Sequence, residues 1–319
     1  MLRPLFLLLA SLLAARSDEV YDVLVYGASP AGIAAAITAA NGTGLRVALL
    51  EPTAYLGGMA GPGGIGLRDT ANPAAAVTGG PRSVMAAWFS LVRAAYPAGN
   101  SVRQPDANIS IAAWEALASS PAYNLTIQRY AALDETPGSL QRSGTRLLSL
   151  RTVDPRTPGG GTPTVWRARY FVDASYEAEL VLASGVDITV GREPRNKYNE
   201  SIGGVLPFPT FQRFRAAVDP FWPNGSLLDG VEPEAALPPA GSGDDRVMPS
   251  SYRACITNDP RLRAPWPRPD GYDEAQFELL IRLAQALPNT TQLGGLVGIY
   301  PYFGYPASAD RPMKYGAWE

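Results

Sequence analysis

The sequence predicts an α/β fold with a central parallel sheet, and three observations along residues 20–51 support it. Residues 20–26 form a short apolar run rich in β-branched and aromatic residues, which is typical of a buried parallel strand. The alanine-rich stretch 33–40 is almost wholly apolar, as expected of a helix that packs on a sheet. Residues 45–50 form a second apolar run, which ends at the acidic Glu51. Strand, loop, helix and strand in this order are typical of a βαβ unit.

The loop between the first strand and the helix has the composition of a phosphate-binding turn. Gly27 permits the tight turn that leaves the strand, and Gly32 lets the helix lie close to the sheet. Pro30 suits the first helical turn, where its missing N–H costs nothing. Backbone N–H groups at the helix start, together with the helix dipole, bind a pyrophosphate. Glu51 follows about 20 residues after Gly32 and can accept hydrogen bonds from a ribose diol.

This pattern is imperfect, because Ser29 stands where Gly-x-Gly-x-x-Gly has its middle glycine. The complete order of strand, loop, helix, strand and acid still predicts a Rossmann-like nucleotide-binding unit. A plain structural βαβ unit without a ligand is the alternative.

A second glycine cluster follows the acid and points to the kind of nucleotide. Gly57 and Gly58 come shortly after Glu51, and residues 61–66 read Gly-Pro-Gly-Gly-Ile-Gly. Such a cluster suits a cofactor whose far end also needs close backbone approach. The length of FAD fits this better than a nicotinamide dinucleotide does. A glycine-rich surface loop is the alternative.

Residues 27–34, 51–53 and 56–59 resemble the FAD-dependent oxidoreductases with a glutathione-reductase-type FAD domain. A subgroup of that family often has Gly-x-Ser/Thr-Pro-Ala-Gly as its first loop, which accounts for Ser29. A second match covers residues 170–180, where the family has a strand that enters Asp-Ala-Thr/Ser beside the FAD, and it continues through residues 183–186, 189–193 and 198–200. A third and weaker match lies at residues 252–257 together with residues 269–272.

The resemblance implies a Rossmann-like FAD/NAD(P)-binding domain with a parallel sheet and a β-meander, with FAD as the cofactor. It also implies a set of cofactor-binding residues: Gly27, Ser29, Pro30, Ala31, Gly32, Glu51, Pro52, Gly57, Gly58, Met59, Asp173, Ala174 and Ser175. Tyr252 and Arg253 are the candidate substrate-facing pair. A tyrosine packed in the core and an arginine bonded to carbonyl groups are the alternative for these two positions. No residue is assigned a catalytic role.

The family is expected to continue after its substrate domain with a late glycine- and acid-containing strand–helix segment that contacts the flavin. No second glycine-rich strand followed by a helix is found after Arg282. Residues 293–300 are glycine-rich, but no alanine-rich helix follows them. The sequence therefore predicts an FAD domain that lacks this return segment and holds the ADP half more securely than the flavin.

Composition excludes several other classes of protein. The 319 residues carry a net charge of −2, which provides no basic field for a nucleic acid. The chain contains no histidine, which excludes Ser-His-Asp and Cys-His hydrolases and histidine-ligated metals. Cys255 is the only cysteine, which excludes an intrachain disulfide and an iron–sulfur cluster. We therefore expect no metal site.

Residues 1–17 have the pattern of a signal peptide. Arg3 provides the positive charge, residues 5–15 are apolar, and small residues precede Asp18. The apolar run is too short for a bilayer core of about 30 Å. Export to the secretory-pathway lumen or the exterior is therefore predicted, with an uncleaved anchor as the alternative. Asn-x-Ser/Thr sequons that agree with this route lie at Asn41, Asn108, Asn124, Asn199, Asn224 and Asn289. Asn41 is expected at a helix end packed on a sheet, where glycosylation is not expected.

The remaining chain indicates organisation more than chemistry. Helices are predicted at residues 83–93 and 111–118, and residues 125–127, 146–150 and 165–171 are predicted to form a β-meander. The FAD-binding domain is assigned to residues 18–200 and a partial, irregular substrate domain to residues 201–319. Residues 275–287 have helical spacing, and the stripe expected to face the core consists of Phe277, Leu280, Ile281, Ala284 and Leu287.

These observations together predict an FAD-dependent oxidoreductase that transfers a hydride from a small organic substrate to FAD. The alternative is a non-catalytic secreted glycoprotein that keeps a degenerate nucleotide-binding shell. Bound flavin in the purified protein distinguishes the two.

Overall fold

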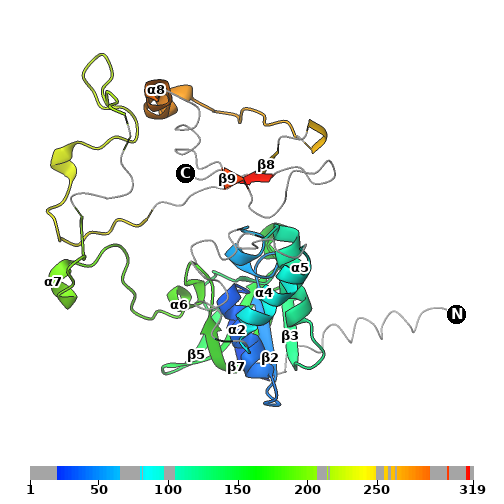
Figure 1. The fold of residues 1–319 in the computed structure, drawn as a ribbon. Coiled ribbons are helices and arrows are strands. Elements are labelled where there is room, and N and C mark those ends of the chain that lie inside the picture. Colours follow the sequence, from blue (N-terminus) through cyan, green and yellow to red (C-terminus); the bar gives the residue numbers. More distant parts are fainter. Residues whose placement is uncertain are drawn as a thin grey trace. The chain divides into compact units, whose positions relative to one another are not determined.

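The computed structural model describes residues 20–64, 80, 82–96, 105–206, 214, 216–248, 255–257, 260–262, 264–287, 300–301 and 314–316. The chain divides into two compact units, residues 1–187 and 188–319, and each is described by itself. Figure 1 shows the elements coloured along the chain. The predicted leader, the pair Tyr252 and Arg253, and Asn289 lie outside the described residues.

A seven-stranded sheet forms the centre of the first unit. Its order is β3-β2-β1-β7-β6-β4, with β5 paired to β6. The four parallel strands are β1 (Val20–Tyr26), β2 (Val47–Glu51), β3 (Leu125–Arg129) and β7 (Thr164–Asp173). The predicted α/β class with a central parallel sheet is confirmed, and the carboxyl ends of these four strands lie at one edge of the sheet.

Helix α2 (Pro30–Ala40) connects β1 to β2 and packs on both strands. The buried side of α2 carries Ile33, Ala36, Ile37 and Ala40, which recur at helical spacing. The Ser29 hydroxyl caps the helix by accepting the Gly32 N–H at 3.2 Å. Helices α4 (Val84–Ala94) and α5 (Ala107–Ala118) pack on each other and on α2 (Figure 1).

The predicted membership of the β-meander is wrong for residues 125–127. These residues belong to β3, which pairs in parallel with β2, so that Ile127 lies opposite Leu49. Parallel pairing is available here because α4 and α5 provide the crossover from β2. The meander itself consists of β4 (Ala132–Leu133), β5 (Leu140–Ser143), β6 (Arg146–Val153) and β7, joined antiparallel.

Two apolar clusters hold the first unit together. One includes Tyr26, Leu50 and Trp166, which link the parallel strands to the meander. In the other, the stacked rings of Trp88 and Trp114 join α4 to α5, with ring centroids 5.2 Å apart. Both indoles are fully buried.

Short elements follow β2, β6 and β7 in the first unit. Helix α6 (Glu179–Ala183) begins soon after β7, and the 3-10 turns are η1 (Gly58–Ala60) and η2 (Pro158–Gly160).

The second unit contains a three-stranded antiparallel sheet, ordered β8-β10-β9. Its strands are β8 (Cys255–Thr257), β9 (Tyr300–Pro301) and β10 (Lys314–Gly316). The helical elements are α7 (Arg195–Tyr198), α8 (Glu278–Ala286), η3 (Glu234–Ala236), η4 (Pro260–Leu262) and η5 (Glu274–Phe277). None of the described helices has both the length and the apolar composition needed to cross a membrane.

The predicted core-facing stripe along residues 275–287 is only partly correct. Leu287 is buried, as is Leu283, which the stripe did not include, but Phe277 and Leu280 are 43% and 49% exposed. The physical reason is that η5 extends to Phe277 before α8 begins. A 3-10 turn advances about 120° per residue, which takes Phe277 out of the α-helical period on which the stripe was based. Leu280 lies within α8, and its exposure has no explanation in the helix period.

Candidate functional site

Three loops meet at the carboxyl ends of β1, β2 and β7. The Gly27 N–H donates to the Leu50 carbonyl at 2.8 Å, and the Ala174 N–H donates to the Tyr26 carbonyl at 2.7 Å. The Gly57 N–H donates to the Ala28 carbonyl at 2.8 Å, which ties the loop after β2 to the loop after β1. Ligands of open α/β sheets bind at this edge.

Gly27 and Gly32 are required by close packing between backbone segments. Gly27 has φ +93°, and a Cβ there would lie 2.6 Å from the Ser175 nitrogen. A Cβ at Gly32 would lie 2.0 Å from the Gly27 carbonyl oxygen and 2.9 Å from the Ala174 Cβ. The close approach of helix to sheet predicted for Gly32 is therefore present.

The start of α2 presents N–H groups to the same edge. Pro30 occupies the first helical turn and has no N–H to satisfy. Among the described residues, the N–H groups of Ser29 and Ala31 find no acceptor. Free N–H groups at the positive end of the helix dipole favour an anion.

Glu51 directs its carboxylate at this loop. The side chain is buried, and its two oxygens accept the Ala28 N–H and the Thr53 N–H, each at 2.8 Å. A carboxylate has about four acceptor positions, so two remain for the hydroxyls of a sugar. The structure therefore adds to the sequence prediction, because Glu51 also fixes the backbone of two loops. Half-buried Pro52 separates Glu51 from Thr53 in the second of these loops.

Gly57 and Gly58 let the loop after β2 pass between aromatic rings. Gly57 has φ +101°, and a Cβ there would lie 2.2 Å from Cδ1 of Trp114. Gly58 has φ +48°, and a Cβ there would lie 2.4 Å from the Tyr176 hydroxyl. The Met59 N–H donates to that hydroxyl at 2.8 Å. Tyr176 lies inside the matched stretch 170–180, yet sequence reasoning gave it no role.

Asp173, Ala174 and Ser175 shape the third loop. One Asp173 oxygen accepts the N–H and the hydroxyl of Ser175, at 2.9 and 2.7 Å, and the other accepts the Val181 N–H at 2.8 Å. The Ser175 hydroxyl accepts the Glu179 N–H at 3.0 Å. Asp173 and Ser175 thus fix the entry into α6, and their direct contact with a cofactor stays a prediction.

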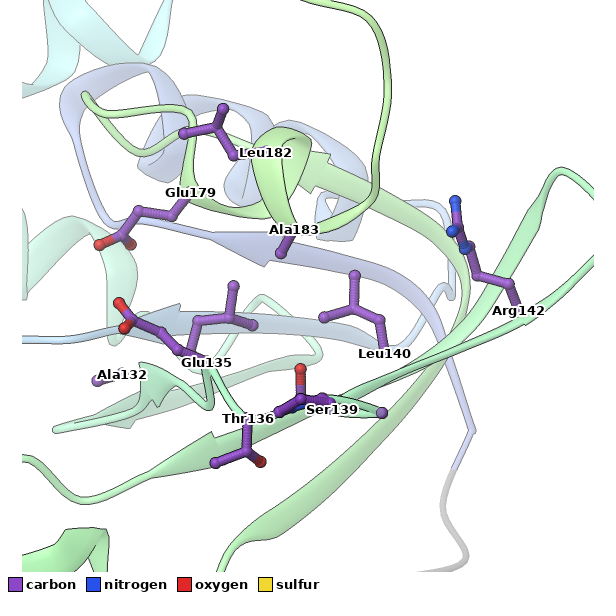
Figure 2. A pocket seen from close by; sticks show the side chains of 12 residues that line it. Ala132, Glu135, Thr136, Ser139, Leu140, Arg142, Glu179, Leu182 and Ala183 are labelled. Carbon is purple, nitrogen blue, oxygen red and sulfur yellow. The ribbon is translucent and has the colours of Figure 1, made fainter.

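A pocket of about 560 Å³ lies between the β4–β5 segment and α6, and sequence reasoning missed it. Figure 2 shows the carboxylates of Glu135 and Glu179 at one end of the pocket and Arg142 at the other. The apolar lining is provided by Leu133, Leu140 and Leu182.

Tyr26 connects this pocket to the carboxyl end of β1. Its hydroxyl accepts the Leu133 N–H at 2.9 Å and interacts with the carboxylate of Glu179. Burial raises the pKa of Tyr26, and the negative charges of Glu179 and Glu51 raise it further. The Ala131 N–H donates to the Glu51 carbonyl at 2.9 Å, and the next residue, Ala132, lines the pocket.

Fold and site together define an α/β protein with a dinucleotide-binding edge of the glycine-loop type. The family described as FAD dependent oxidoreductase matches residues 22–303, and the chain belongs to this family. FAD is therefore the cofactor, and the general activity is that of an oxidoreductase. The free N–H groups, the glycines that admit no Cβ and the Glu51 carboxylate fit the ADP part of FAD. In the part of the chain that the structure describes, no group of three or more His, Cys, Asp or Glu residues is placed to hold a metal ion.

Solved structures with similarity to this chain include THI4 of Thermovibrio ammonificans, at 19% identity over 59% of this chain and 72% of that chain, with a TM-score of 0.37. Glycerol-3-phosphate dehydrogenase of Bacillus halodurans, solved in complex with FAD, matches at 12% identity over 58% of this chain and 42% of that chain, with a TM-score of 0.37. L-proline dehydrogenase of P. horikoshii matches at 19% identity over 56% of this chain and 25% of that chain, with a TM-score of 0.28. A search of curated proteins returned no match.

Proposed function

We propose that the chain binds FAD at the edge formed by β1, β2 and β7 and oxidises a small organic molecule. The observation that carries the proposal is the convergence at this edge of free N–H groups, a buried carboxylate and four glycine-dependent contacts. When bound, FAD supplies the ability to accept a hydride, so the protein needs to supply only orientation and electrostatics.

The residues of the first loop receive the diphosphate. The N–H groups of Ser29 and Ala31 donate to its oxygens, and the dipole of α2 offsets its negative charge. Glu51 accepts from the two hydroxyls of the adenosine ribose through the acceptor positions that Ala28 and Thr53 leave open.

The adenine ring enters the pocket beside Glu51. The pocket has the volume of a small-molecule site, and its lining combines leucine side chains with polar groups. The carboxylates of Glu135 and Glu179 at one end suit the exocyclic amino group of adenine, which is a hydrogen-bond donor.

The absorbance spectrum of the purified full chain tests the proposal. We expect a visible flavin band, present as isolated or restored by added FAD, that bleaches with dithionite and also with the true substrate in a screen of small alcohols, amines and acids. A colourless protein that does not take up added FAD would instead support a non-catalytic shell. A flavin band that no small molecule bleaches would leave FAD binding standing and contradict the proposed oxidation.

We also propose that the chain is exported and glycosylated. The five described sequon asparagines are exposed, Asn41 at the end of α2 included, which supports this proposal. Expression in a eukaryotic secretory host is expected to give a product in the medium whose mobility increases after peptide-N-glycosidase treatment. A product that stays in the cell with unchanged mobility would contradict it.

A further inference from the structure

Tyr176 joins two loops that lie far apart in the chain. It follows β7 at its carboxyl end, and its hydroxyl accepts the Met59 N–H at 2.8 Å across 117 residues of sequence. Its ring lies directly against Gly58, where a Cβ would be 2.9 Å from Cε2. The ring is therefore held on one side by the Gly58 backbone and at its tip by Met59.

Only half of the hydrogen-bonding capacity of this phenol is used. A tyrosine hydroxyl both accepts and donates, and the Met59 contact uses it as an acceptor. Among the described residues no acceptor is found for its proton. Burial raises the pKa of Tyr176, and the charges of Glu51 and Glu177 raise it further, so the hydroxyl keeps its proton. Tyr176 is also 51% exposed, which leaves it accessible to a ligand.

The surroundings of Tyr176 identify the acceptor. The residue before it, Ser175, has its nitrogen 2.6 Å from the Cβ position of Gly27. The loop that Tyr176 contacts is bound to the first loop through Gly57 and Ala28. The backbone before Tyr176 and the loop that its hydroxyl contacts therefore both adjoin the first loop, which leads into the start of α2. A diphosphate there offers several charged acceptor oxygens, and a hydrogen bond to a charged acceptor is about twice as strong as a neutral one.

We propose that Tyr176 donates its phenolic proton to the diphosphate of bound FAD while it holds the Met59 N–H, and is thus a cofactor-binding residue. This inference rests on the proposed FAD site. It assigns to one side chain both the closure of the loop after β2 and a direct contact with the cofactor.

The test is the Tyr176→Phe variant of the full chain, titrated calorimetrically with FAD, ADP-ribose and adenosine. The variant keeps the ring against Gly58 and removes only the hydroxyl. We expect the affinities for FAD and for ADP-ribose to fall roughly 10- to 100-fold, because a hydrogen bond to a charged group is lost. The affinity for adenosine, which has no phosphate, is expected to stay unchanged.

Tyr170→Phe is the matched control, because it removes a hydroxyl from the 71% exposed Tyr170 on β7 and is expected to change none of the three affinities. Equal weakening of all three ligands would show that Tyr176 acts only by closing the loop, and would overturn the inference. Weaker FAD with unchanged ADP-ribose would move the contact to the ribityl or flavin part and would also overturn it, as would unchanged affinity throughout. A wild-type chain that binds no FAD is a separate result, in which the proposed function fails together with this inference.

Discussion

Tyr26 places a hydroxyl in an apolar core, where most polar groups have a hydrogen-bond partner. Its side chain is fully buried, and the hydroxyl accepts the Leu133 N–H and faces the Glu179 carboxylate. One oxygen atom thereby connects the carboxyl end of β1 to the lining of the pocket. Tyr26 is therefore a structural link between the proposed phosphate and adenine sites.

We predict that Tyr26→Phe lowers the free energy of unfolding by about 1–3 kcal/mol, because the buried Leu133 N–H loses its acceptor. The matched control is Tyr21→Phe. The Tyr21 ring is buried in the same cluster, but its hydroxyl has no partner among the described residues. Its loss is expected to cost less than about 0.5 kcal/mol. Urea denaturation measures the free energy of unfolding of both variants. An equal loss in Tyr26→Phe and Tyr21→Phe would contradict the structural role of the Tyr26 hydroxyl.

Asp134 makes part of the stability of the meander depend on pH. One of its oxygens accepts the N–H and the hydroxyl of Thr136, at 2.9 and 2.7 Å, and Arg151 Nε lies 3.0 Å from the other. The Thr136 hydroxyl chiefly holds the pKa of Asp134 below its ordinary value of 3.8, with a smaller contribution from the Arg151 charge.

Because this pKa is lowered by folding, the unfolded chain binds a proton before the folded chain does as pH falls. The stabilisation is complete above the unfolded pKa of about 3.9 and is lost as pH falls from there through the lower folded value. Asp134→Asn is expected to be less stable than the wild type at pH 7 and to lose less of its stability on acidification. Unfolding midpoints measured from neutral to acidic pH check this, and parallel curves would be inconsistent with it.

At the scale of elements, the sequence predicts the helices and strands whose type and order depend only on the residues within and beside them. The strand–loop–helix–strand order of β1, α2 and β2 was predictable because each element has its own periodicity and caps. The parallel pairing of β3 was not predictable, because the composition of residues 125–129 suits a parallel strand and an antiparallel strand equally well. Direction is determined by the crossover through α4 and α5, which is a property of the chain around the strand.

We predict that Gly32→Ala lowers both stability and FAD affinity. The new Cβ would meet the Gly27 carbonyl oxygen at 2.0 Å, and relief requires a shift of α2 at a cost of about 1–3 kcal/mol. That shift moves the N–H groups which receive the diphosphate.

Gly44→Ala is the control for this prediction. Gly44 has φ +72° with no atom within 4 Å of its Cβ position, so alanine there costs only the backbone conformation, about 1 kcal/mol. Its FAD affinity is expected to equal that of the wild type. Flavin fluorescence titration measures the FAD affinity of both variants. An unchanged affinity in Gly32→Ala would contradict the proposed role of the start of α2 in binding the diphosphate.

At the scale of the whole molecule, the site was predictable where its parts are close in sequence. Gly27, Gly32 and Glu51 belong to one βαβ unit, so their spacing alone indicates a nucleotide. Tyr176 and the pocket at Glu179 were not predictable in this way. Tyr176 and Glu179 lie near the site only because β7 pairs with β1, and no local sequence pattern predicts that pairing. The substrate role of Tyr252 and Arg253 stays a prediction, since both lie outside the described residues.

Thermal unfolding of the full chain with and without FAD tests the central claim most directly. A ligand that binds only the folded state stabilises it by about 2.7 kcal/mol at a hundredfold excess over its dissociation constant. We predict a concentration-dependent rise of the unfolding midpoint for the wild type and no rise for Glu51→Lys, which removes the acceptor for the ribose and for the first loop. A wild-type midpoint that FAD leaves unchanged, in a preparation that contains no flavin, would contradict the account.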